Sequence, residues 1–191
     1  MDQLQHQLRP WLIALCFVAA ACGNDGTAGR AQAATRVDSA VSREAELARF
    51  RDGLTEPAAL AGGAASRDAL VRAFVRALQA RDTIALAGLL LTRAEFAYLY
   101  YPTNPEARPP YNLSPGLMWF MLEGRSRRGI TQALEHHGGQ PLRYAGRSCA
   151  ASQQQGENTV WIGCTVQGER LFGPIIERGG RFKFVSYANK L

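Results

Sequence analysis

Between about residues 41 and 137, apolar residues recur every three to four positions in several segments, the spacing of one face of a helix. A short helix is expected over residues 42–51, and a second follows Ser66, which suits an N-cap. Asp82 can cap a third helix, and Ser114-Pro115 is a typical helix start. We expect the helix after Pro115 to be interrupted over residues 124–129, where two glycines occur, and to end before Gly138-Gly139.

From Leu142 the apolar period changes to two, which indicates strands. Four are expected, over residues 142–150, 159–167, 170–177 and 181–187, with turns at residues 155–158 and at Gly179-Gly180. Helices followed by an antiparallel sheet predict an α+β fold with the helices on one face of the sheet.

The N-terminus has the order of an export signal. Arg9 precedes an apolar run that ends in Ala19-Ala20-Ala21-Cys22. The run is about half the ~20 residues needed to span a bilayer. The four last residues resemble the lipobox of bacterial lipoproteins, although Ala19 replaces the usual Leu or Val. We expect Cys22 to be acylated. Simple secretion after cleavage at Ala21 and an uncleaved anchor are the alternatives.

These patterns divide the chain into a lipoprotein signal peptide (1–21), a flexible tether (22–41), a short helix with a linker (42–65) and an α+β domain (66–191). The protein is therefore expected to be tethered to a membrane of the bacterial cell envelope, with the domain facing the periplasm or the exterior. From Ser66 onward 16 Lys and Arg stand against 9 Asp and Glu. Such a charge attracts a domain to anionic surfaces, but solubility is the preferred explanation of the charge. Export and the lack of a basic run with interleaved aromatics argue against a nucleic-acid partner.

Residues 66–191 resemble the nuclear transport factor 2-like (SnoaL-like) superfamily, a cone-like fold of helices on a curved sheet. The resemblance rests on the helix 70–78, on Asp82 with the apolar positions after it, and on the closing segment 179–187. It implies a pocket between the helices and the sheet. Because the superfamily contains enzymes, ligand binders and assembly domains, it does not decide the function.

Superfamily enzymes place an acid as general base in an apolar pocket. Glu95, which precedes an aromatic cluster, is the one weak candidate, and an arginine-paired surface acid is the competing interpretation. His136 and His137 point about 100° apart on a helix and suit no shared ion, so we expect no metal and no cofactor.

The segment from Tyr98 to Tyr111 is unusual for its tyrosines and prolines. Tyr98, Tyr100, Tyr101 and Tyr111 are candidates for a stacking surface that binds a glycan, a lipid or a protein. The alternative is that they pack back onto the domain.

Cys149 and Cys164 are expected to form a disulfide. Both are equally distant from a turn centred between Gly156 and Glu157, so they lie opposite each other on paired strands. An exported protein meets an oxidising compartment. The competing interpretation is a pair of small core residues.

The expected function is a non-catalytic module that binds a protein, a glycan or a small apolar ligand, or assembles with a partner. A small-molecule isomerase, cyclase or hydrolase that uses the cone pocket is the alternative.

Overall fold

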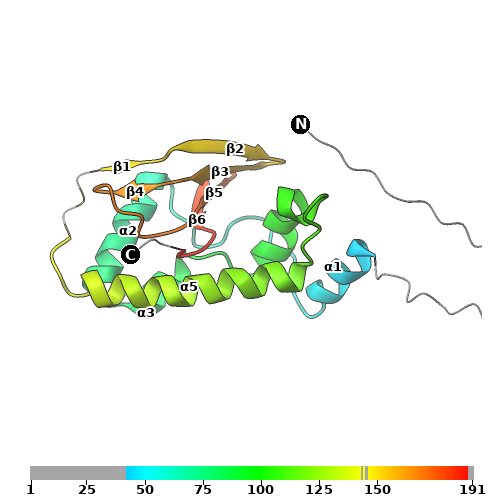
Figure 1. Cartoon of the computed structure of the whole chain (residues 1–191), viewed down its shortest axis with the longest axis horizontal. Coiled ribbons are helices and arrows are strands. Elements are labelled where there is room, and N and C mark those ends of the chain that lie inside the picture. Colours follow the sequence, from blue (N-terminus) through cyan, green and yellow to red (C-terminus); the bar gives the residue numbers. More distant parts are fainter. Residues whose placement is uncertain (1–41, 143, 145, 189–191) are drawn as a thin grey trace, which may run out of the picture. The chain divides into compact units, whose positions relative to one another are not determined.

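The computed structural model describes residues 42–142, 144 and 146–188 (Figure 1). The expected signal peptide, the tether and Cys22 lie outside the described residues. The helical segments are α1 (Arg43–Arg51), α2 (Arg67–Gln79), α3 (Thr83–Gly88), α4 (Arg93–Glu95), the π-helix η1 (Phe96–Tyr100), the 3₁₀ turns η2 (Tyr101–Thr103) and η3 (Pro105–Ala107), and α5 (Pro115–His137). The strands are β1 (Arg147–Ser148), β2 (Ala151–Gln155), β3 (Asn158–Ile162), β4 (Thr165–Val166), β5 (Ile175–Arg178) and β6 (Arg181–Phe184).

The four main strands form an antiparallel sheet in the order β2-β3-β5-β6, and β1 pairs with β4. The predicted α+β class is confirmed. The strands are shorter than expected. β2 begins at Ala151, directly after the first expected strand, and ends at Gln155, the first residue of the predicted turn. Gly179 and Gly180 form the β5–β6 turn as predicted, both at positive φ.

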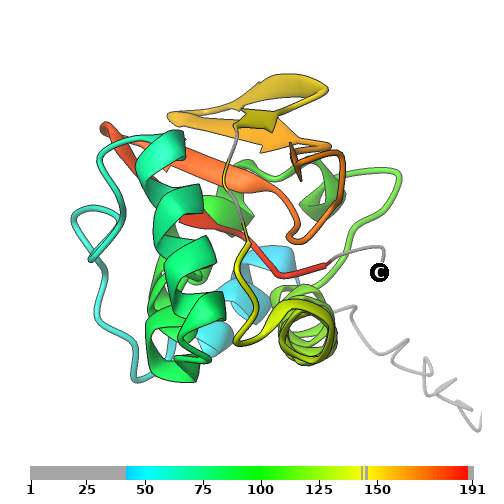
Figure 2. The same cartoon turned by 90° about the vertical axis from the view of Figure 1, so that its left-hand side faces the viewer.

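Helical segments cover both faces of the sheet, so the expectation that they cover one face was wrong. Phe184 of β6 packs in one core cluster with Phe74 of α2. Ile175 of β5 packs in this same cluster, whereas its neighbour Ile176 packs in a second cluster with Phe96 of η1. Because successive residues of a strand point to opposite faces, these contacts place α2 and η1 on opposite sides of the sheet. Figure 1 shows the two segments on either side of β5 and β6, and Figure 2 shows α2 and α5 beneath the hairpin of β2 and β3.

Residues 42–65 belong to the same compact unit as the rest of the described chain. The domain therefore begins earlier than the expected Ser66. Phe50 of α1 and Leu60 are buried in the second core cluster. Ala64 forms a bridge with Phe182 of β6.

α5 is a continuous helix, so the predicted interruption at residues 124–129 was wrong. Its buried face carries the small residues Ser126, Gly129 and Ala133. Small side chains allow a helix to approach its neighbours closely, and the resulting packing outweighs the low helix propensity of glycine, about 1 kcal/mol per residue.

The disulfide between Cys149 and Cys164 is present as predicted. Arg147 pairs with Val166 and Ala151 pairs with Ile162, so one register runs along both arms of the hairpin and places the cysteines opposite each other. Cys164 is also buried in the first core cluster. It is therefore both a disulfide partner and a small core residue.

Within the described part of the chain, no helix combines the length and the apolar character needed to cross a membrane.

Candidate functional site

An open groove of about 350 Å³ lies between α3, α4 and α5. The segment after β6 forms its floor. Its volume is at the lower end of the range of small-molecule sites in proteins. The lining residues are Thr83, Leu86, Ala87, Leu90, Leu91, Thr92, Arg93, Trp119, Leu122, Glu123, Ser126, Arg127, Ile130, Val185 and Tyr187.

α5 provides one wall of the groove with residues spaced along a single helix face. Trp119, Leu122, Ser126 and Ile130 follow one another at intervals of three and four residues, which brings them into line. The opposite wall comes from α3, where Asp82 caps the helix by accepting from Ala85 N at 2.9 Å. Most of these lining side chains are apolar, so the groove offers a hydrophobic surface.

The polar atoms at the bottom of the groove are occupied by hydrogen bonds within the domain. The Ser126 hydroxyl accepts from Tyr187 N at 3.2 Å, and the Tyr187 hydroxyl donates to Leu86 O at 2.6 Å. Burial raises the pKa of Tyr187, so its hydroxyl stays protonated and remains a donor. The floor is thus rigid and neutral.

The charged residues of the groove lie at its rim. The Arg93 guanidinium stacks over the Phe50 ring, 4.5 Å from the ring centroid. Glu123 and Arg127 are exposed on α5, and neither side chain has a hydrogen-bond or ion-pair partner among the described residues. Two arginines and one carboxylate therefore give the rim a net positive charge.

Glu95 does not line this groove. Its side chain is almost fully buried (1 % exposed) and contacts the Lys183 ammonium, with Oε2 at 2.8 Å and Oε1 at 3.2 Å. It also accepts from Thr92 N and from Ala61 N, both at 2.7 Å. The interpretation of Glu95 as an arginine-paired surface acid was wrong, because its partner is a buried lysine.

These four contacts give Glu95 a structural role. The bond to Thr92 N completes a capping box at the start of α4, and the bonds to Ala61 and Lys183 join that helix to the N-terminal segment and to β6. A carboxylate with both oxygens engaged in this way is poorly placed to take a proton from a ligand.

The structure separates the four candidate tyrosines. Tyr100 and Tyr101 are buried in the second core cluster. Tyr98 is half-buried beneath the Arg51 guanidinium, and its hydroxyl donates to Leu54 O at 3.4 Å. Only Tyr111 is exposed. Tyr98, Tyr100 and Tyr101 pack back onto the domain, so they form no joint stacking surface with Tyr111.

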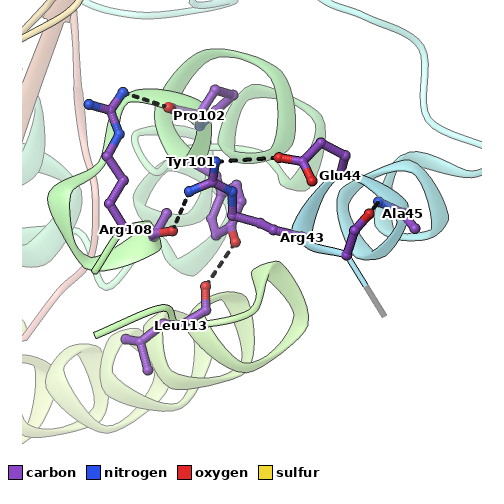
Figure 3. Close-up of polar contacts among 9 residues, drawn as sticks. Arg43, Glu44, Ala45, Tyr101, Pro102, Arg108 and Leu113 are labelled. Carbon is purple, nitrogen blue, oxygen red and sulfur yellow. Dashed lines mark hydrogen bonds and ion pairs between the residues drawn. The ribbon is translucent and has the colours of Figure 1, made fainter. Parts of the chain in front are cut away.

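Tyr101 fixes the proline-rich segment to the start of α5 (Figure 3). Its hydroxyl donates to Leu113 O at 2.8 Å. Arg43 of α1 donates to Ala107 O at 2.9 Å in the same region. This segment contains the two 3₁₀ turns η2 and η3.

No group of three His, Cys, Asp or Glu side chains in the described ranges is arranged to hold a metal ion. His136 and His137 close α5, and His137 Nε2 lies 3.1 Å from Glu169 Oε2.

Comparison of the chain with protein-family models, with curated proteins and with solved structures finds no match. The groove is therefore interpreted from its own residues. Its wall on α5 was not predicted, because the spacing from Trp119 to Ile130 is visible only when that helix is continuous.

Proposed function

We propose that this protein is an exported lipoprotein, acylated on Cys22, whose nuclear transport factor 2-like domain is a non-catalytic binding module. Its ligand is a small molecule with an apolar body and one anionic group, bound in the groove between α3, α4 and α5. The observation that carries this proposal is the apolar groove with the Arg127 guanidinium at its rim, which has no partner among the described residues.

The disulfide supports the exported location. Disulfides persist in oxidising compartments such as the bacterial periplasm and are rare in the cytosol. Cys149 and Cys164 lie opposite each other on adjacent strands, where the bridge forms without rearrangement of the hairpin. Together with the small residues before Cys22, this supports delivery to the cell envelope.

The chemistry of the groove supports a binding role over the alternative of an isomerase, cyclase or hydrolase. Of the residues that line the groove, Glu123 is the one carboxylate, and it is exposed at the rim and not buried among the apolar side chains. The buried carboxylate of Glu95 is engaged by Lys183 and two backbone amides outside the groove. A largely apolar groove with a neutral floor and charges only at its rim is suited to hold an amphipathic ligand in one orientation.

The anchor is tested by metabolic labelling with radioactive palmitate. The wild type should incorporate label and Cys22→Ala should not, because acyl chains attach to the Cys22 side chain and to the amino group that cleavage exposes there. Equal labelling of the two proteins, or release of the wild type in soluble form, contradicts the lipoprotein proposal.

The groove is tested by filling it from an exposed helix position. Ala87 of α3 lines the groove and is exposed, so Ala87→Trp obstructs the groove without removing a core side chain. Ala85 is exposed on the same helix and does not line the groove, which makes Ala85→Trp the matched control.

We expect isothermal titration calorimetry with decanoate to show binding to the wild type and to Ala85→Trp. In Ala87→Trp the affinity should fall at least tenfold, the scale of losing the burial of a few methylenes. Equal affinity in all three proteins, or no binding to the wild type, contradicts the groove as the ligand site.

A further inference from the structure

The outer face of α5 carries two exposed apolar side chains one turn apart. Phe120 is 72 % exposed and Leu117 is 48 % exposed. Trp119 follows Leu117 by two positions, and Leu122 follows Phe120 by two positions; both Trp119 and Leu122 line the groove. Two positions correspond to about 200° around a helix. The pair therefore faces away from the domain and away from the groove.

The same helix face continues into arginines. Gly124 follows Phe120 by one turn, and Arg128 follows Gly124 by another. The Arg128 guanidinium lies back over Gly124, with Nη1 3.7 Å from the point that a Cβ there would occupy. Arg125 is exposed beside it. Neither Arg125 nor Arg128 has a side-chain partner among the described residues. Leu117, Phe120, Gly124, Arg125 and Arg128 form a surface that we call the outer stripe.

The outer stripe begins at the end of the domain where the described chain begins. Ser42 caps α1, and a shallow cleft lined by Phe50, Pro115 and Gly116 among others separates α1 from the start of α5. Figure 1 shows α1 beside this end of α5. The first helix of the described chain therefore lies at the end of α5 where the outer stripe begins.

We propose that the outer stripe docks the domain on the surface of an anionic lipid bilayer. Aromatic and aliphatic side chains enter the boundary between headgroups and acyl chains, while arginines bind lipid phosphates. A coil as long as the predicted tether (residues 22–41) spans about 25 Å on average, so it holds the stripe near the membrane. The inference rests on the proposed lipid anchor for this proximity, but it needs neither the groove nor its ligand.

The test uses residues 22–191 with Cys22→Ser, a chain that contains the whole compact unit and carries no acyl group. Sedimentation with vesicles measures binding to phosphatidylcholine alone and to phosphatidylcholine with one third phosphatidylglycerol. We expect partition to be at least tenfold stronger on the anionic vesicles and to weaken in high salt. Equal binding to both vesicles, or none to either, contradicts the inference even if palmitate labels Cys22.

Two pairs of variants separate the stripe from general attraction by a basic protein. Leu117→Ser/Phe120→Ser should lower partition about tenfold or more, whereas Ile84→Ser, at an apolar position 85 % exposed on α3, should not change it. Arg125→Gln/Arg128→Gln should lower partition by about fivefold for each arginine. Arg76→Gln/Arg170→Gln, which removes the same charge from exposed positions elsewhere, should have a smaller effect.

Equal losses in the two arginine pairs would show that net charge alone drives binding, and this would overturn the proposal. A second copy is the other possible occupant of the stripe. Sedimentation velocity should show a monomer, and a dimer abolished by Leu117→Ser/Phe120→Ser would also overturn it.

Discussion

Charged groups meet apolar surroundings in two regions of this domain, and the two regions differ in whether the charges are paired. Within the core, Glu95 and Lys183 are 1 % and 2 % exposed and bind each other. At the rim of the groove, Arg127 and Glu123 are exposed and have no partner in the described part of the chain. The paired charges hold elements of the fold together, and the unpaired charges are available to a ligand.

The physical reason for this difference is desolvation. A buried ion loses its hydration, at a cost of several kcal/mol, and this is offset only when a counter-ion and further hydrogen bonds replace water. Glu95 has such replacements in Lys183, Thr92 and Ala61. An exposed ion keeps its water, so it stays unpaired at little cost.

The largest effect should come from breaking the buried pair. Lys183→Met leaves the Glu95 carboxylate without its counter-ion in the core, and the free energy of unfolding should fall by about 3–5 kcal/mol. Urea unfolding followed by circular dichroism measures this loss.

The matched control is Glu95→Gln/Lys183→Met. The glutamine carries no charge and keeps an acceptor for one of the two amides, Thr92 N or Ala61 N, which bind different oxygens of Glu95. The double variant should therefore be more stable than Lys183→Met alone. If both variants lose the same stability, the buried charge is not the cause.

The next largest effect should come from the disulfide. Cys149→Ala/Cys164→Ala releases a bridge that closes 15 residues, which should lower stability by about 3 kcal/mol in the chain-entropy model. Reduction of the wild type with dithiothreitol before urea unfolding should give a similar loss. Two free thiols in the unreduced protein purified from the periplasm would contradict the bridge.

A smaller effect is expected at the proline-rich segment. Tyr101→Phe removes the donor to Leu113 O from a buried site, which should cost about 1 kcal/mol. Tyr111→Phe alters an exposed side chain and should change stability by less than about 0.5 kcal/mol. Equal losses in thermal unfolding would show that Tyr101 is not the residue that fixes this segment.

The sequence predicts well what local chemistry determines. Ser66, Asp82 and Ser114 cap their helices as expected because a capping side chain bonds to its own first turn. The hairpin register, and with it the disulfide, followed from counting residues on either side of Gly156-Glu157.

Long-range packing was not predictable in the same way. Glu95 and Lys183 lie 88 residues apart, and nothing near either residue indicates that the other is its partner. Gly124 and Gly129 indicate a break locally, but the close packing of α5 keeps the helix intact. The groove was missed for the same reason, since its wall on α5 requires that continuous helix.

The central claim is that the unpaired rim charge serves a ligand and not the fold. Arg127→Gln should therefore change the free energy of unfolding by less than about 0.5 kcal/mol, as expected for an exposed position. Its effect should appear in binding alone, and the most direct measurement is isothermal titration with decanoate and with decanol, which share an apolar chain but differ in charge.

We predict that Arg127→Gln lowers the affinity for decanoate about tenfold, because a charge-assisted hydrogen bond is lost, and leaves the affinity for decanol unchanged. Affinities for both molecules that fall together, or that both stay at the wild-type value, would contradict this account of the groove.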